Sequence, residues 1–173
     1  MKPVSHTLAT IGMLVVMAAV SGCGYRMAES GYLNESVTRV AVTVFENNTS
    51  ESRAGVSFSN ELIREITQKS DTEVVSVDNA TRVIEGTVKA ITFSTQSRSS
   101  DETVTEREVT ARVDVKLTGP DGNILWSVKD FTSSESYTVS SDSEDDQAAK
   151  NEAVETIAER VAERLVSLML SRF

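Results

Sequence analysis

The sequence predicts an α/β (α+β) two-layer sandwich, with two helices packed on one face of a mostly antiparallel sheet of about four strands. Several segments alternate apolar and polar residues, which is the period of a β-strand, whereas two others repeat apolar residues every three or four positions, as helices do. These segments follow one another as strand, helix, several strands, helix. Because each helix has one apolar stripe, we expect both to cover the apolar face of one sheet.

The first strand and the first helix are predicted at 39–46 and 54–69. Arg39 to Glu46 alternates, with valines on one face, and the turn-forming run Asn47-Asn48-Thr49-Ser50 ends it. The stretch from Ala54 to Lys69 then changes to the helical period. Its apolar stripe consists of Phe58, Leu62 and Ile66, with Ile63 beside them. Its polar side is expected to hold Glu61, Arg64 and Glu65.

Three further extended segments follow. Glu73 to Val77 is a short apolar strand, and Arg82 to Ser94 is a longer one whose apolar residues change face, which indicates a β-bulge near Ala90. The polar run from Thr95 to Asp101 is expected to be a hairpin loop. Val104 to Thr118 is the clearest strand, because its odd-numbered residues are apolar and its even-numbered residues polar over most of its length.

A hairpin is predicted around the run Gly119-Pro120-Asp121-Gly122-Asn123, before a last strand from Ile124 to about Val139. The inward residues are odd-numbered before the turn and even-numbered after it, so facing residues should have numbers with an odd sum. A two-residue turn of Asp121-Gly122 meets this condition. It places Val115 opposite Val128, Leu117 opposite Trp126, Lys116 opposite Ser127 and Asp114 opposite Lys129.

The last helix is predicted from about Glu144 to Ser171. Ser143 followed by Asp146 resembles a capping box, and acidic residues suit the first turn of a helix. The acids at 142, 144 and 146 could instead belong to a calcium loop, but the glycine and the later glutamate of that loop are missing. The apolar stripe consists of Val154, Ile157, Ala158, Val161, Leu165, Leu168 and Met169.

The N-terminal residues have the pattern of a lipoprotein leader. Lys2 precedes an apolar run from Ile11 to Val20, and small residues then lead to Cys23. Val20-Ser21-Gly22-Cys23 resembles the bacterial lipobox, which implies cleavage before Cys23 and a lipid on its sulfur. We therefore expect a signal peptide at 1–22, a lipidated tether at 23–38 and one domain at 39–173. An ordinary signal peptide or an uncleaved anchor is the alternative, although the apolar run is short for a span of about 20 residues.

Composition excludes several functional classes. The chain has a formal net charge of −9, and loss of Lys2 with the leader makes it −10, so general binding of nucleic acid is not expected. Cys23 is the only cysteine, and His6 in the leader is the only histidine. The remaining domain therefore has no disulfide, no histidine-based catalytic triad and none of the usual zinc ligands. We expect no metal, no catalytic residues and no enzyme activity.

Several short motifs in a fixed order resemble the lipopolysaccharide-assembly lipoprotein family, LptE. They are Cys23-Gly24-Tyr25, then Phe45-x-Asn47-x-Thr49 before the first helix, then Asn79-Ala80 and the strand Val83-Ile84-Glu85-Gly86-Thr87-Val88. The resemblance implies a non-catalytic protein on the periplasmic face of the outer membrane, anchored by diacylglycerol and N-acyl lipid on Cys23. Gly24, where an aspartate would favour retention in the inner membrane, agrees with that location. The implied partners are the LptD β-barrel, which the protein plugs and helps to assemble, and lipopolysaccharide.

A candidate lipopolysaccharide-binding surface lies on the sheet face opposite the helices. The predicted register brings Arg112, Lys116 and Lys129 together there, with Asp114 as the one nearby acid, and cationic side chains suit the phosphates of lipid A. Arg98 and Arg107, toward the other end of the hairpin, could extend the patch. The alternative is a solvated strand face with cross-strand ion pairs.

Two other functions compete with this interpretation. Activators of a periplasmic peptidoglycan synthase can share the strand, Asn/Thr turn and helix at the start of the domain, so Phe45 to Thr49 does not separate the two classes. A hydrolase is the third reading. It is disfavoured because the chain has no Gly-x-Ser-x-Gly motif and no histidine base in the predicted domain. Glu106 and Glu108 could be proposed as a catalytic pair of carboxylates, but acids on one face of a strand are far more often solvated.

Overall fold

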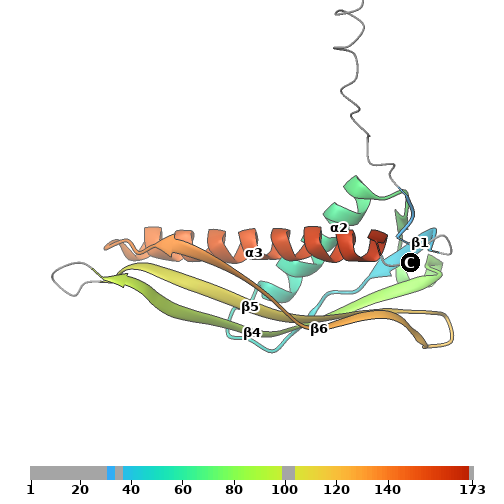
Figure 1. Ribbon diagram of the computed structural model, residues 1–173, viewed down its shortest axis with the longest axis horizontal. Helices are drawn as coiled ribbons and strands as arrows, with labels where there is room; N and C mark the ends of the chain where they lie inside the picture. The colour runs from blue at the N-terminus through green and yellow to red at the C-terminus, as the bar shows by residue number, and fades with distance from the viewer. Residues whose placement is uncertain (1–30, 34–36, 99–103, 172–173) are drawn as a thin grey trace, which may run out of the picture.

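The computed structural model describes residues 31–33, 37–98 and 104–171, and it contains two α-helices, a short 3-10 helix and six strands. The elements are β1 (Arg39–Val42), β2 (Glu46–Asn47), α2 (Ala54–Lys69), β3 (Glu73–Val74), η1 (Val77–Asn79), β4 (Arg82–Arg98), β5 (Val104–Thr118), β6 (Ile124–Thr138) and α3 (Ser143–Ser171). Both helices lie on the same side of the sheet (Figure 1). The predicted two-layer α+β sandwich is therefore confirmed.

The sheet is mixed. Its strand order is β3-β1-β4-β5-β6, and β2 pairs with β4 off this path. The three long strands β4, β5 and β6 form an antiparallel meander, whereas β1 runs parallel to both β3 and β4 and β2 runs parallel to β4. The helix α2 lies in the connection between the parallel strands β1 and β4, which need a long crossover. Four strands are longer than two residues, as expected.

The core lies between the sheet and the helices. Every second residue of β5 from Val109 to Leu117 is buried, so the predicted alternation of this strand is confirmed. The stripe of α2 is buried as predicted, and so is that of α3, except that Leu168 is only half-buried. Glu65 is a correction, because it was expected on the polar side of α2 but is only 7% exposed.

The first predicted strand is broken in two. Within residues 39–46, the backbone leaves the sheet after β1 and pairs with it again at β2. Between the two strands, the side chain of Phe45 is buried, whereas that of Val44 is 66% exposed. A Cβ added at Gly86 would lie 2.4–2.5 Å from carbon atoms of the Phe45 ring. A Cβ at Gly55 would lie 2.3 Å from the Phe45 carbonyl oxygen. The break thus places the Phe45 ring against Gly86 of β4 and the Phe45 carbonyl group against Gly55, which joins the sheet to the start of α2.

The packed part of the chain begins before the predicted boundary at Arg39. Leu33 and Val37, which fall in the expected tether, are 1% and 0% exposed. The Leu33 backbone N–H donates to Thr72 Oγ1 (2.9 Å), and that hydroxyl donates to the Val37 carbonyl oxygen (2.8 Å). Leu33 and Val37 of this stretch therefore pack into the domain, and the predicted boundary at Arg39 lies too late in the chain. Cys23 and the leader lie outside the described residues.

The predicted register of the β5–β6 hairpin is confirmed from Val115 to Leu117 but not at the turn, nor at Asp114, which was expected opposite Lys129 and has no paired residue in β6. Val115 pairs with Val128, Lys116 with Ser127 and Leu117 with Trp126. Gly119 N–H donates to the Asn123 carbonyl (2.9 Å) and Gly122 N–H to the Gly119 carbonyl (3.0 Å), with Gly122 at φ +75°. The loop therefore has three residues, 120–122, with its glycine in the left-handed region.

A bulge restores the register after this longer loop. The pairing shifts by one residue between Leu117–Trp126 and Thr118–Ile124, so Leu125 is the extra residue. The prediction of a two-residue turn was wrong, because a three-residue loop followed by a bulge also places the inward-facing residues of the two strands opposite each other.

Two more bulges lie side by side in the middle of the sheet. The predicted bulge near Ala90 is confirmed, because the pairing of β4 with β5 shifts between Val88 and Ala90 and leaves Lys89 extra. A second bulge at Lys129 and Asp130 of β6 was not predicted, and Asp130 has φ 51°. Beyond this bulge the odd-numbered residues of β6 face the core. Phe131 therefore follows Val128 on the core side, where unbroken alternation would have placed Asp130.

Several element ends differ from the prediction. The strand β3 ends at Val74, where the chain turns into η1, and β4 continues to Arg98 rather than ending at Ser94. The cap of α3 is Asp142 instead of Ser143, because Asp142 Oδ1 accepts hydrogen bonds from the backbone N–H groups of Glu144 (2.8 Å) and Asp145 (3.3 Å). This is a helix start and not a calcium loop.

Candidate functional site

The uncovered face of the sheet carries the predicted cations, and the structure places acids between them. Asp130 Oδ1 lies 2.8 Å from Lys89 Nζ and 3.8 Å from Arg112 Nε. Asp114 Oδ2 lies 3.4 Å from the same lysine, and Asp114 Oδ1 accepts a hydrogen bond from the Asp130 backbone N–H (2.7 Å). The bulges at Lys89 and at Lys129–Asp130 are thus joined across β5 by one cluster of charges. The expectation that Asp114 alone balances the cations was wrong.

The ion pairs shift the titration of this cluster. The hydrogen bond from Lys89, followed by the charge of that lysine, lowers the pKa of Asp130 below its ordinary value. The hydrogen bond to Asp130 raises the pKa of Lys89 in turn. Both groups lie at the surface, so water screens the attraction and the cluster organises the bulges more than it stabilises the fold.

A groove of about 350 Å³ lies beside this cluster, toward the β5–β6 turn. Lys116 borders it and pairs with Glu85 (3.1 Å), whereas Lys129 has no ion-pair partner among the described residues. The groove also has the exposed apolar side chains of Val44 and Ile124, which are 66% and 61% exposed. Cations beside apolar side chains can receive a ligand that has both a phosphate and an acyl chain.

The structure separates Arg98 and Arg107 from this face. Arg107 lies two residues before the buried Val109 on β5, so its side chain projects to the same side of the sheet, which is the side that the helices cover. Arg98 pairs with Val104 at the far end of the hairpin, eight residues along β5 from Arg112 and thus about 26 Å away. The length of the strand and the odd number of Arg107 already imply this separation, so the sequence itself contained the signal against the extended patch. The groove could not be predicted, because Val44 and Ile124 are far apart in the chain.

The motif that precedes α2 forms a second site. Asn47 Oδ1 accepts hydrogen bonds from the Thr49 backbone N–H (3.1 Å) and hydroxyl (2.8 Å), and Asn47 Nδ2 donates to the Glu51 carbonyl (2.8 Å). The Glu51 backbone N–H donates to Thr49 Oγ1 (3.1 Å). These bonds fix the turn between β2 and α2, so the Phe-x-Asn-x-Thr pattern has a direct structural role.

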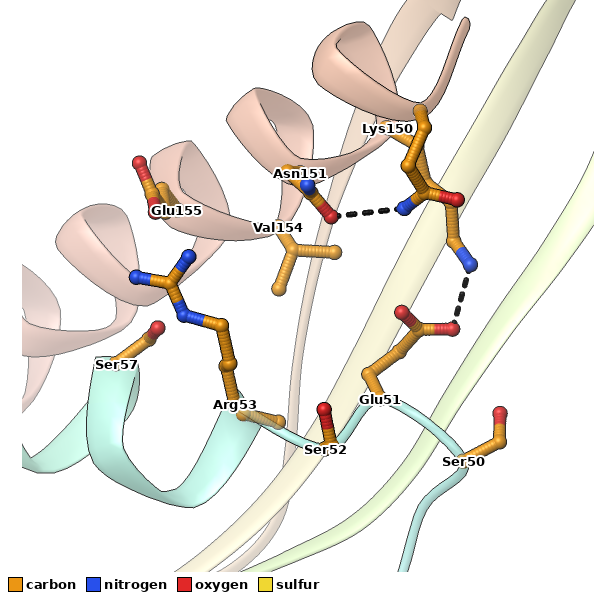
Figure 2. Close-up of a pocket in the computed structure, with 11 residues that line it drawn as sticks. Ser50, Glu51, Ser52, Arg53, Ser57, Lys150, Asn151, Val154 and Glu155 are labelled. Carbon is orange, nitrogen blue, oxygen red and sulfur yellow. Dashed lines mark hydrogen bonds and ion pairs between the residues drawn. The ribbon is translucent and has the colours of Figure 1, made fainter. Parts of the chain in front are cut away.

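The same turn holds the start of α3. Glu51 Oε1 lies 2.7 Å from Lys150 Nζ, and this nitrogen lies 4.6 Å from the centre of the Phe93 ring. A pocket of about 530 Å³ opens beside this pair, and Figure 2 shows Arg53 and Glu155 near each other at its end away from Lys150 and Glu51. The remaining wall consists mostly of serine hydroxyls and side-chain amides. The pocket is polar and open, and its half-buried ion pair serves to join the turn to α3.

The described residues hold no group of three or more His, Cys, Asp or Glu side chains arranged to hold a metal ion. Within the same part of the chain, neither helix is long and apolar enough to cross a membrane. The carboxylates Glu106 and Glu108 lie on β5, opposite Thr138 and Ser136 of β6.

Comparison with known proteins gives a family match. A family model for lipopolysaccharide assembly, LptE, matches residues 37–172. A comparison with curated protein sequences finds no match. Among solved structures, uncharacterized lipoprotein B from Nitrosomonas europaea is similar, with 18% identity, a TM-score of 0.57 and coverage of 83% of this chain and 88% of that one. Rare lipoprotein B from Shewanella oneidensis has 15% identity, a TM-score of 0.55 and coverage of 77% and 94%. At these identities the likeness shows a shared fold.

Proposed function

Because the chain belongs to the LptE lipopolysaccharide-assembly family, we propose that it is the lipoprotein subunit of the outer-membrane lipopolysaccharide translocon. In this role it is anchored by lipid on Cys23 at the periplasmic face, plugs the LptD β-barrel and assists its assembly. The observation that carries the proposal is the family match, which spans nearly all of the packed domain, from Val37 to the end of α3. The family is one of non-enzymatic lipoproteins, so the protein acts by binding.

Direct contact with lipopolysaccharide is the second part of the proposal, and we place it at the groove on the uncovered face. Lys129 supports this placement because it is exposed and forms no ion pair among the described residues, so a phosphate breaks no such pair there. Val44 and Ile124 offer exposed apolar surface within the same groove for an acyl chain. Arg112 and Lys116 already have acidic neighbours and contribute less. Arg98 and Arg107 lie outside this groove and form no part of it.

Co-purification tests the barrel partnership. The tagged full-length protein is solubilised from native outer membrane in mild detergent, and its partners are separated before and after boiling. We expect a heat-modifiable β-barrel identified as LptD. Recovery of a penicillin-binding synthase in its place would overturn the proposal in favour of a synthase activator.

Binding of purified lipopolysaccharide to the full chain in detergent tests the groove. The double variant Lys116→Glu/Lys129→Glu should bind much more weakly than wild type, while a variant with the same change at a distant exposed arginine, Arg53→Glu, should bind as wild type does. Arg112→Glu/Lys116→Glu, which leaves Lys129 in place, should have the smaller effect. Unchanged binding in a folded Lys116→Glu/Lys129→Glu variant would exclude this groove, and co-purified LptD would then support the barrel role alone.

A further inference from the structure

The free edge of β6 borders a groove that no part of the proposed function uses. β6 is the last strand of the sheet, and β5 is its one hydrogen-bonded neighbour in the described chain. Beyond the bulge at Asp130, β6 runs beside α3 (Figure 1). A groove of about 620 Å³ lies here, between Phe131–Ser134 of β6 and Arg160, Glu163 and Arg164 of α3. One wall is therefore a strand edge and the other a helix.

The backbone of β6 faces this groove with hydrogen-bonding groups that do not pair with β5. Arg160 Nη1 donates to the Ser134 carbonyl oxygen (3.2 Å), so that carbonyl points away from β5 and toward the groove. In an antiparallel strand the N–H and C=O of one residue point the same way, and this direction alternates along the strand. The backbone groups of Thr132 therefore point outward as well.

The charges around the groove indicate what kind of chain it accepts. Arg160 forms an ion pair with Glu135 next to the edge, whereas Arg164 has no ion-pair or hydrogen-bond partner among the described residues. Glu163 also lines the groove and disfavours a run of acids. One isolated carboxylate opposite Arg164 fits this arrangement, because an arginine binds a carboxylate with two parallel hydrogen bonds.

We propose that the groove between β6 and α3 binds an extended segment of a partner protein, which adds a strand to the free edge of β6 and places one acidic side chain against Arg164. Addition of a strand to a free sheet edge is a recurrent mode of peptide recognition, in which backbone hydrogen bonds give affinity and side-chain contacts give specificity. Arg160 covers part of the edge in the free protein and so protects it from unspecific pairing.

The test measures fluorescence anisotropy of a short fluorescein-labelled peptide that alternates threonine and valine and has one central aspartate. The full-length protein in detergent should bind it saturably, and a peptide with lysine in place of the aspartate should bind at least about tenfold more weakly, as expected for loss of a charge-assisted hydrogen bond. Arg164→Glu should reduce binding of the aspartate peptide by a similar factor. Arg53→Glu is the matched control and should bind as wild type does.

Thr132→Pro tests the strand addition itself. This change removes an outward N–H and no bond to β5, so the fold should persist while binding is lost. If that variant fails to fold, the same test is made on the peptide. Methylation of the backbone nitrogens of the aspartate peptide removes the N–H groups that would pair with β6, so the methylated peptide should not bind. The proposal is overturned if wild type shows no saturable binding, or if Arg164→Glu and the methylated peptide bind normally. It is also overturned if sedimentation shows that a second copy of the chain occupies the edge.

Discussion

The ring of Phe45 occupies the space that a side chain at position 86 would need, and this contact joins the irregular segment after β1 to the middle of β4. Gly86→Ala forces the ring or the strand to move, so it should lower the free energy of unfolding by about 1–3 kcal/mol, as overpacking of a core does. A urea melt measures the change. Gly119→Ala is the control, because its added Cβ would have ordinary contacts at 3.7–3.8 Å. Equal stabilities of the two variants would contradict this account of Phe45.

Asn47 holds the turn before α2 with both atoms of its side-chain amide. Asn47→Ala should therefore cost about 1–2 kcal/mol, the net worth of a few partly buried hydrogen bonds. The neighbouring Asn48 is exposed, and only its backbone N–H is bonded, to the Val88 carbonyl (3.0 Å), so Asn48→Ala should be nearly neutral in the same melt. If both changes are neutral, the turn does not depend on the asparagine.

Asp130 gives the protein a pH dependence at the acid end. Because its pKa is lower in the folded chain than its ordinary value of 3.8, its contribution to stability is present above that value and is lost as the pH falls through the folded pKa. Asp130→Asn removes the charge but suits the positive φ nearly as well as aspartate does. Melting temperatures at acidic and neutral pH should differ less for this variant than for wild type. An equal decrease in melting temperature at acidic pH in both proteins would show that another group is responsible for the pH dependence.

At the level of elements, α3 is the largest contributor to the layer that covers the sheet. Leu165 lies on its apolar stripe and is 1% exposed. Leu165→Ala should lower the free energy of unfolding by about 2–5 kcal/mol because it leaves a cavity. Glu155 of the same helix is exposed and has no described ion pair, so Glu155→Ala should change stability by about 0.5 kcal/mol or less. A neutral Leu165→Ala in a urea melt would mean that α3 does not close the core.

The elements that could be predicted from the sequence are those with a long and regular pattern. β5 and α2 have the predicted bounds, because the alternation around Val113 and the repeat through Leu62 extend over many residues. The break after β1 could not be predicted, because Val44 continues the alternation that the structure abandons. The bulge at Asp130 was missed for a related reason, since the residues beyond it are mostly small and polar and do not mark a face.

The candidate site depended on contacts that the sequence does not encode locally. The placement of Arg112 and Lys116 on the same sheet face as Lys129 could be predicted, because the alternation of apolar residues shows which residues of each strand face away from the core. The acids that pair with two of these cations could not be predicted, because Asp130 reaches Arg112 only through its bulge and Glu85 comes from a third strand. The groove between β6 and α3 likewise arises from packing between elements.

For the whole molecule, the proposed lipid on Cys23 would decide where the domain works. Cys23 is the only cysteine, so Cys23→Ala should prevent lipidation and release the protein from the membrane fraction. The domain should still fold, since no disulfide is lost and the described core starts only at Leu33. Fractionation followed by a carbonate wash measures the release, and circular dichroism of the released protein checks the fold. A variant that stays with the membrane after the wash would require another anchor.

The placement of α3 has a consequence for the order of folding. The meander of β4, β5 and β6 joins neighbouring segments, but its apolar face stays open until α3 packs on it, and the contact of α3 with α2 joins Arg64 to Glu159, 95 residues apart. Such distant contacts form slowly because a long loop must close first. A chain that is still being synthesised therefore cannot complete its core before its last helix is available, and the apolar face of the meander stays uncovered until then.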